Sequence, residues 1–225
     1  MAGPVSEKPS GPRSYRSPLR ERQAAQTRET ILQALADEIV SSGIQALSVA
    51  AVANRADVAE RTIYRYFPNV EALLEGLTSS VSAQLAEYMG ERPRLEPGRH
   101  EAPDDLAAHL PHLYEALDRI GAPARAMAIV TLARGSDTGR QRRRDTLARI
   151  LEPELAHLDP AAADAMFETL YLLGGLISWF LLTRSGALDG AQAGRAAARS
   201  IQAILTDLRS EQAEQAAMPP YPGRA

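Results

Sequence analysis

Five side chains suited to contacting nucleic acid lie within six consecutive residues of this sequence. Guanidinium, hydroxyl and phenol groups donate hydrogen bonds to phosphate oxygens, and a guanidinium also binds guanine through two parallel hydrogen bonds. A short helix carrying such residues fits the major groove of DNA. The sequence therefore predicts a DNA-contacting helix that contains Arg61, Thr62, Tyr64, Arg65 and Tyr66.

The residues around this cluster have the pattern of two short helices joined by a tight turn. Asp57 occupies the turn, where the backbone commonly needs a positive φ angle, and Asp tolerates this better than most residues. Ser48 is placed to cap the first of the two helices with its hydroxyl. The pattern predicts a helix-turn-helix over residues 48–67, with internal contacts made by Ala53, Val58 and Ile63.

Further helices are predicted on both sides of the motif. Upstream, an apolar stripe at helical spacing indicates a helix that ends at Gly43, which is predicted to be a left-handed C-terminal cap. Downstream, Pro68 ends the DNA-contacting helix, and Asn69 is placed to cap a fourth helix with Glu71 in its first turn. The upstream stripe consists of Ile31, Leu32, Leu35 and Ile39.

Four segments combine at a characteristic spacing. They are Ile31-Leu32-x-x-Leu35, Gly43-Ile44-x-x-Leu47-Ser48, Val52-Ala53, and Thr62-Ile63-Tyr64-Arg65-Tyr66-Phe67-Pro68 followed by Glu71-Ala72-Leu73-Leu74. Together they resemble the DNA-binding domain of the tetracycline-repressor (TetR) family of bacterial regulators. The resemblance runs from about Thr27 to Leu77 and implies sequence-specific binding to double-stranded DNA.

The resemblance also implies a role for each polar residue of the motif. The phosphate contacts that it implies are Arg28, Ser48, Thr62, Tyr64 and Tyr66, and the base contacts are Arg61 and Arg65. The residues themselves leave alternatives open, because the two tyrosines also suit packing inside a small domain and Arg65 also suits a solvated surface.

Three positions depart from the family's pattern. Asp57 stands where Gly is usual, Ala59 stands where a Ser usually caps the second helix, and Val70 stands where a Lys usually binds phosphate. These departures predict weaker anchoring on the DNA backbone at this end of the motif, with the fold retained.

The first 22 residues are predicted to form a disordered basic arm. Between Lys8 and Arg28 there are six basic residues and one acidic residue, although the whole chain has a net charge of −3. Such an arm can lie along phosphates or enter the minor groove, or it can have no role. The chain has no Cys, and its first twenty residues lack an apolar stretch, so we expect a cytoplasmic protein.

The sequence predicts an all-α fold of two units. A three-helix DNA-binding domain with the helix-turn-helix covers residues 23–70, and a helical effector-binding and dimerisation domain covers residues 71–215. Residues 216–225 are predicted to be a disordered tail, and 93–103 a Pro-rich, charged loop. Strand patterns are almost absent. Helices of the second unit are expected near 70–90, 104–120, 123–134, 139–157, 161–183 and 191–215.

The last two predicted helices suggest a homodimer interface. Residues 169–183 are apolar on nearly every side and must be buried on every side, yet they are too short to cross a membrane. Gly174 and Gly175 would permit close approach of a partner. The resemblance likewise implies that helices 161–183 and 191–215 pair across a two-fold axis, which predicts a roughly palindromic operator. The stripe of the last helix consists of Ile201, Ile204, Leu205 and Leu208.

A small-molecule effector is implied by the resemblance, and its identity is left open. Few charges are available to line a pocket in this unit, so the ligand is expected to be largely apolar or aromatic. Each candidate also suits ordinary core packing. The run from Arg140 to Arg144 suits a solvated helix face better than a second nucleic-acid site. The candidate lining residues are His112, Tyr114, Arg125, Met127, Met166, Tyr171 and Trp179.

The residues do not favour an enzyme. The four His residues have no carboxylate partner at a recognisable spacing, and no phosphate-binding loop or nucleophile motif is present. We therefore expect no catalytic residue, no metal and no cofactor. The resulting hypothesis is a transcriptional regulator that acts as a repressor and that a ligand releases from its operator. The alternatives are a DNA-binding regulator without an effector and a helical enzyme.

Overall fold

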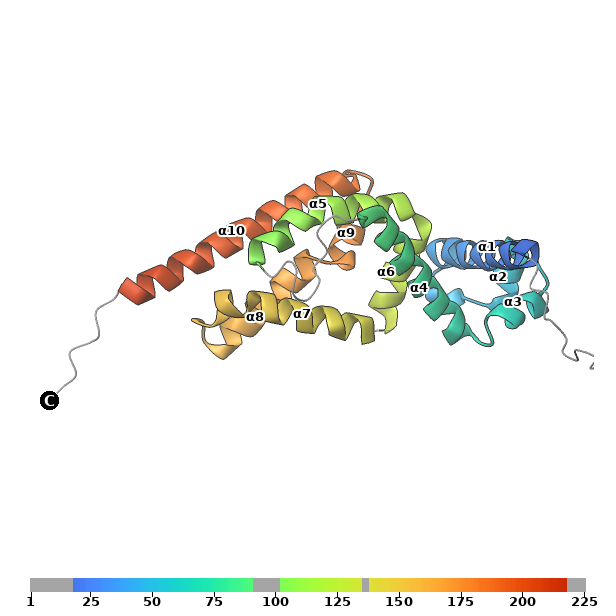
Figure 1. Cartoon of the computed structure of the whole chain (residues 1–225), viewed down its shortest axis with the longest axis horizontal. Coiled ribbons are helices and arrows are strands. Elements are labelled where there is room, and N and C mark those ends of the chain that lie inside the picture. Colours follow the sequence, from blue (N-terminus) through green and yellow to red (C-terminus); the bar gives the residue numbers. More distant parts are fainter. Residues whose placement is uncertain (1–17, 91–101, 135–137, 218–225) are drawn as a thin grey trace, which may run out of the picture.

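The structure is a computed structural model that describes residues 18–90, 102–134 and 138–217. Within these ranges every regular element is a helix, which confirms the all-α prediction (Figure 1). The helices form an elongated molecule, with α1 to α3 at one end and the C-terminus of α10 at the other. In chain order the elements are α1 (Pro18–Ser42), η1 (Ile44–Ala46), α2 (Val49–Ala56), α3 (Glu60–Tyr66), α4 (Val70–Met89), α5 (Pro103–Ile120), α6 (Ala122–Arg134), α7 (Thr138–Leu155), α8 (Pro160–Leu173), α9 (Leu176–Thr183) and α10 (Gly190–Ala217).

The first three helices pack around a small apolar core. The predicted stripe of α1 is fully buried, together with Val52 of α2 and Ile63 of α3. A polar contact joins α1 to α2 at the edge of this core, where Arg55 Nη2 lies 2.8 Å from Glu38 Oε2. Hydrogen bonds from Arg55 hold the pKa of Glu38 below its ordinary value, so this pair stabilises the fold at neutral pH and is lost in acid.

The predicted turn and the two predicted N-caps are confirmed, whereas the predicted C-cap is not. Asp57 has φ 52° and ψ 46°, the left-handed conformation that the turn requires. The Ser48 hydroxyl accepts the Ala51 N–H at 3.1 Å, and Asn69 Oδ1 accepts the Ala72 N–H at 2.8 Å. Gly43 has a positive φ of 79°, but its ψ of 161° places it outside the left-handed helical cap that was expected.

Three predicted boundaries change. Helix α1 begins at Pro18, so the last residues of the expected arm, 18–22, are helical, and residues 1–17 lie outside the described part. Pro103 starts α5 instead of ending the loop, and the rest of that loop lies outside the described residues except Ala102. Helix α10 continues to Ala217, beyond the expected end at 215, and the remaining tail is not described.

The prediction of a single helix over residues 161–183 is wrong. Two helices, α8 and α9, replace it, bent by 58° at the break between them. Two adjacent glycines weaken the helix there, and Arg143 Nη2 of α7 donates a hydrogen bond to the Gly174 carbonyl. No single helix in the described ranges is long and apolar enough to cross a membrane, and the bent pair α8–α9 passes that test only by length and composition.

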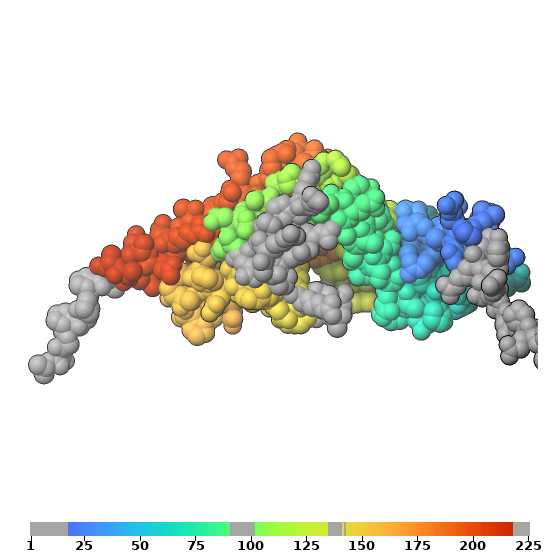
Figure 2. Space-filling view, in the orientation of Figure 1, coloured from blue at the N-terminus to red at the C-terminus, as the bar shows by residue number. Residues whose placement is uncertain are grey.

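Helix α10 packs along α5 within the same chain (Figure 1). Ile201, Leu205 and Leu208 of α10 are buried within the single chain, so most of the stripe that was expected at a dimer interface serves the chain's own core. Gly194 permits the close approach, because a Cβ atom there would lie 2.6 Å from Pro111 Cα. The end of α10, residues 210–217, is exposed and extends past the body in Figure 2.

Helices α4 and α6 connect the two parts of the molecule. Helix α6 packs against α1 on one side, and α4 contacts α1, α5 and α6. An ion pair between Arg134 of α6 and Glu71 of α4 joins the two connecting helices near the first domain, with Nη1 2.5 Å from Oε2. A displacement of either helix would therefore reach α1 and the helices packed on it.

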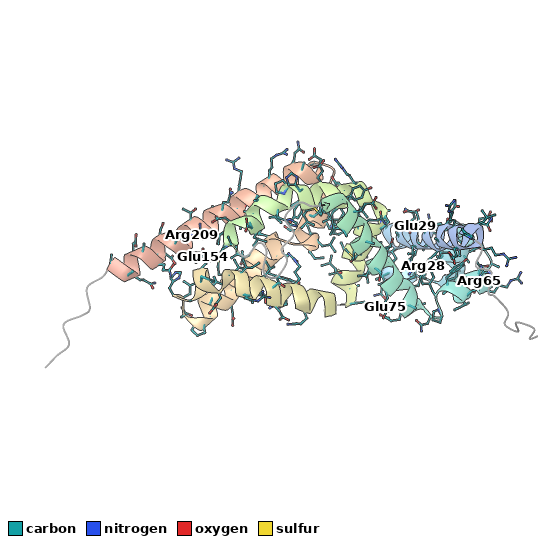
Figure 3. The ribbon with its side chains drawn as sticks, viewed as in Figure 1. Arg28, Glu29, Arg65, Glu75, Glu154 and Arg209 are labelled. Atoms are coloured by element: carbon teal, nitrogen blue, oxygen red, sulfur yellow. The ribbon has the colours of Figure 1, made fainter. Side chains whose placement is uncertain are left out.

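Arg209 joins α10 to both α5 and α7 through ion pairs. Its guanidinium lies 2.7 Å from Glu154 Oε1 of α7 and 3.0 Å from Asp104 Oδ2 of α5. Figure 3 shows Arg209 and Glu154 between α10 and α7. Hydrogen bonds from Glu154, then Asp104, raise the pKa of Arg209, so the cation persists at every physiological pH.

Candidate DNA interface and effector cavity

Helix α3 presents three of its predicted contact residues to the surface. Arg61, Tyr64 and Arg65 are exposed, whereas Ile63 and the following Phe67 are buried against the other helices. The exposed fraction of Tyr64 is 49%, which places this ring outside the core and removes the packing alternative for it. Helical periodicity puts positions 61, 64 and 65 on one face, so the three side chains can contact one surface.

Arg65 and Tyr66 form one wall of a groove between α3 and α1. Arg65 Nη2 donates a hydrogen bond to Tyr66 Oη at 3.2 Å, and its guanidinium carbon lies 4.9 Å from the Tyr66 ring centroid. The groove is open and has a volume of about 820 Å³. Polar side chains of α1 form its other wall, among them Arg20, Gln23, Thr27 and Thr30.

The other three predicted DNA contacts flank this face. Thr62 is partly buried and Ser48 is exposed at the start of α2, where its oxygen accepts a backbone N–H and its hydroxyl proton can still be donated. Arg28 is exposed, and its guanidinium carbon lies 5.0 Å from the centroid of Phe67. Figure 3 shows Arg28 and Arg65 at the same end of the molecule.

Helix α3 begins without a side-chain cap. Ala59 has the extended conformation of an N-cap residue, with φ −71° and ψ 145°, but offers no acceptor to the free N–H groups of the first turn. Ala59→Ser is therefore expected to raise the free energy of unfolding by about 1 kcal/mol in urea denaturation. Ala25→Ser, at an exposed interior position of α1, should lower it slightly. Equal effects of the two substitutions would contradict the capping argument.

An apolar cavity of about 420 Å³ lies between helices α4, α5, α6, α7 and α9. This volume is within the range of small-molecule sites. Three polar residues, His109, Arg143 and Thr146, also line it. The cavity can thus hold a hydrocarbon or aromatic body and offers a cation at one side. The apolar lining includes Leu85, Leu113, Leu117, Met127, Leu147 and Leu176.

A second cavity of about 450 Å³ lies between α6, α7, α8 and α9. The two cavities share Arg143, Gly175 and Leu176, so these residues stand at their junction. Thr131 and Leu132 of α6 line the second cavity, and Met127 of the same helix lines the first. Helix α6 therefore contacts both cavities and α1 of the DNA-contacting end.

The predicted pocket residues divide into two groups. Met127 lines the first cavity and Tyr171 lines the second. The other predicted residues line neither cavity: His112 is exposed on the outside of α5, and Arg125 and Met166 are partly buried. Their assignment to a ligand site gains no support from the geometry of these two cavities.

Tyr114 and Trp179 are core residues with satisfied polar atoms. Tyr114 Oη donates to the Leu173 carbonyl at 2.7 Å, and burial raises the pKa of its phenol to about 12. Trp179 Nε1 donates to Asp118 Oδ1 at 3.0 Å, and the Arg125 guanidinium lies over the indole. The polar groups of these rings hold α5 to α8 and α9, which explains why they do not face a ligand.

Sequence reasoning missed Arg143 and His109. The expectation of a solvated face for the arginine run is wrong at Arg143, which is partly buried against Gly174 and Gly175. The sequence pattern that could have predicted its burial is its position four residues before the buried Leu147, on the apolar side of α7. Of the two histidines three residues apart on α5, His109 faces a cavity. In the described ranges no three His, Asp or Glu residues are grouped as a metal site would require.

The helix-turn-helix and its neighbouring helices match a known protein family. Residues 31–77 match the family model described as "Bacterial regulatory proteins, tetR family". This match covers α1 from its buried stripe, the helix-turn-helix and the first part of α4. No curated protein sequence matches the chain.

Two of three similar solved structures are described as transcriptional regulators, and the third as a multidrug binding protein. A TetR-like transcriptional regulator from Rhodococcus sp. RHA1 matches with a TM-score of 0.58 at 16% identity, over 81% of this chain and 97% of that one. Another transcriptional regulator from that organism has a TM-score of 0.47 at 21% identity, over 80% and 96%. The multidrug binding protein EbrR, complexed with imidazole, has a TM-score of 0.48 at 20% identity, over 95% and 100%. The first of these matches, at 16% identity, shows a likeness of fold alone.

Proposed function

This chain carries the DNA-binding domain of the TetR family, and from that premise we propose a homodimeric repressor that a small, largely apolar ligand releases from its operator. TetR-family proteins are DNA-binding regulators that act as dimers with small-molecule ligands, and they are not enzymes. The observation that carries the proposal is the exposure of Arg61, Tyr64 and Arg65 on a short helix at one end of the molecule. The protein would act in the cytoplasm, where the DNA lies.

We assign DNA binding to residues 23–70. In this proposal Arg61 reads a base in the major groove, because its side chain is exposed on the outer face of α3. Arg65 stacks on the Tyr66 ring and donates a hydrogen bond to its hydroxyl, beside α1. We therefore assign phosphate contacts to this pair, and base reading by Arg65 is the alternative. Thr62, Tyr64, Ser48 and Arg28 supply further phosphate contacts that fix the register of the helix on the duplex.

We assign effector binding and dimerisation to residues 71–215. The dimer would form through the segments 161–183 and 191–215, using faces other than the buried stripe of α10. Support comes from two large apolar side chains, Leu172 of α8 and Leu181 of α9, which are about half exposed in the single chain. A two-fold pair of α3 helices would bind a roughly palindromic operator.

In the proposed switch, ligand entry moves α4 and α6. Leu85 of α4 and Met127 of α6 line the first cavity, and the Arg134–Glu71 ion pair joins the same two helices near the first domain. A ligand that favours one position of these helices changes the separation of the two α3 helices in the dimer. Affinity for the operator then falls, because both half-sites are no longer engaged together.

The test is binding of the purified protein to the DNA that flanks its gene, against scrambled DNA of equal length, across a salt series. We expect tighter binding to the flanking DNA, two chains per operator, and a steep fall in affinity with salt. Screening of apolar compounds then identifies those that release the DNA. Equal binding to both DNAs contradicts specific regulation from this site, and operator binding that no ligand alters favours a regulator without an effector.

A further inference from the structure

Arg143 differs from its neighbour Arg144 in how its charge is balanced. Arg144 makes two hydrogen bonds to the carboxylate of Glu168, at 2.5 and 3.0 Å. Arg143 instead donates to a neutral group, the Gly174 carbonyl, and stacks on Tyr171 with its guanidinium carbon 4.8 Å from the ring centroid. Among the described residues, the structure gives Arg143 no carboxylate partner. A partly buried cation thus stands without an anion.

Two glycines leave the space that the Arg143 guanidinium occupies. A Cβ atom at Gly175 would lie 2.8 Å from Nη1, and one at Gly174 would lie 3.3 Å from Nη2, so side chains there would displace the group. Burial lowers the pKa of Arg143 below its ordinary value, which shows that its charge is poorly solvated. A guanidinium has five N–H donors, and the acceptors that face Arg143, the Gly174 carbonyl and the Tyr171 phenol, are both neutral.

The charges around both cavities favour an anion. Glu168 lines the second cavity, but Arg144 neutralises it, so the charge of Arg143 remains in excess. Helix α9 begins at Leu176 beside Arg143, and no side chain caps its first turn. The positive end of this helix adds to the same field. The rest of the first cavity is mainly leucine and methionine.

We propose that this site takes an amphipathic monoanion, a carboxylate or sulfonate whose charged group binds Arg143 at the junction and whose hydrocarbon or aromatic body fills the 420 Å³ cavity. The inference rests on the proposed function only in naming this ligand the effector. It specifies the largely apolar ligand as an acid, and it assigns to Arg143 the recognition of the charged group.

The experiment uses two fluorescent probes with the same ring system. 8-Anilinonaphthalene-1-sulfonate carries one negative charge, and N-phenyl-1-naphthylamine lacks it. Each is titrated into the full-length protein and into Arg143→Met, Arg143→Lys and Arg149→Met. Arg149→Met removes an exposed cation from the same helix and is the matched control. Circular dichroism melting checks that each variant is folded.

We expect Arg143→Met to weaken binding of the sulfonate by about tenfold and to change binding of the neutral probe less than about twofold. Arg143→Lys, which keeps the charge, should hold the sulfonate within about threefold of the parent. Arg149→Met should leave both affinities unchanged. If the methionine variant fails to fold, Arg143→Gln, which also removes the charge, takes its place with the same expected loss for the sulfonate alone.

Three results would overturn the inference: no binding of the sulfonate by the parent protein, equal losses for both probes in Arg143→Met, or the same loss of sulfonate binding in Arg149→Met. None of them bears on operator binding, because the titrations contain no DNA. Failure of the proposed function would show instead as a lack of preference for operator DNA while the probe results stand.

Discussion

Replacing Arg61 and Tyr64 together by alanine is expected to lower the affinity for operator DNA by about 100-fold and to leave the domain folded. Both side chains are exposed on the outer face of α3, so their removal deletes few contacts within the protein. The core residues of the same helix, Ile63 and the adjacent Phe67, are unchanged. Loss of binding would then report on DNA contact and not on unfolding.

The expected magnitude follows from the two contacts proposed. A bidentate contact from Arg61 to a base contributes about 2 kcal/mol of discrimination, and a phosphate hydrogen bond from Tyr64 about 1 kcal/mol. The single variants should separate these roles. Tyr64→Phe should weaken binding to all sequences, whereas Arg61→Ala should relax preference at particular bases and leave binding to scrambled DNA nearly unchanged.

Fluorescence anisotropy with labelled DNA across a salt series makes the measurement. The matched control is Arg119→Ala with Tyr88→Ala, which removes the same two residue types from exposed positions outside the first three helices. A comparable loss in the control would mean that α3 is not the contact. An Arg61→Ala variant that loses affinity equally for every sequence, with a shallower salt slope, would assign Arg61 to phosphate instead of a base.

The first domain could be predicted closely because its determinants are local. Ser48 and Asn69 each accept a backbone N–H three residues ahead, and Asp57 adopts the left-handed turn that its position demands. Caps and turns depend on a few neighbouring residues, so the sequence alone specifies them. The buried positions followed from the helical spacing of apolar residues, since a domain this small has only one way to bury one stripe per helix.

The break between α8 and α9 could not be predicted, because a contact distant in sequence decides it. Gly in a helix costs about 1 kcal/mol relative to Ala, which a well-packed helix tolerates. Here Arg143 enters the space left by Gly174 and Gly175 and bonds to a carbonyl at the break. Nothing within residues 161–183 shows that an arginine from another helix lies there.

The cavity was predicted in kind but only partly in its residues. Leucines surround much of the first cavity, and two of the candidate residues, Met127 and Tyr171, line one cavity each, while their role in ligand binding stays a prediction. Tyr114 and Trp179 are also large, mainly apolar side chains on helices, yet both are fully buried in the core. Composition identifies residues that suit a pocket, but helix packing decides which of them meet a void and which meet one another.

Gly190→Ala combined with Gly194→Ala is expected to reduce the free energy of unfolding by about 4 kcal/mol, a large part of the stability of an ordinary domain. The two residues lie one turn apart on α10, where that helix packs along α5. A Cβ atom at Gly194 would lie 2.7 Å from the Leu110 carbonyl oxygen. One at Gly190 would overlap the Tyr114 carbonyl oxygen and lie 2.9 Å from Asp118 Oδ2.

The shortest of these clashes involve backbone atoms of α5, so rotation of a side chain cannot relieve them. The helices must move apart, which loosens the contact that buries Ile201 and Leu205. Gly190 also donates its N–H to Asp118, the carboxylate that accepts the Trp179 N–H. Displacing α10 therefore weakens the polar link between α5 and α9 as well as the apolar packing.

Helix propensity and packing predict opposite signs for Gly194→Ala, which makes urea denaturation decisive. Alanine in the interior of an isolated helix is favoured over glycine by about 1 kcal/mol, so propensity alone predicts a more stable protein. The packing predicts a loss of about 2 kcal/mol at this position. Ser200→Ala, at an exposed position of the same helix, is the matched control and should gain a few tenths of a kcal/mol. If Gly194→Ala gained stability as the control does, α10 would not lie against α5 as closely as the glycines indicate.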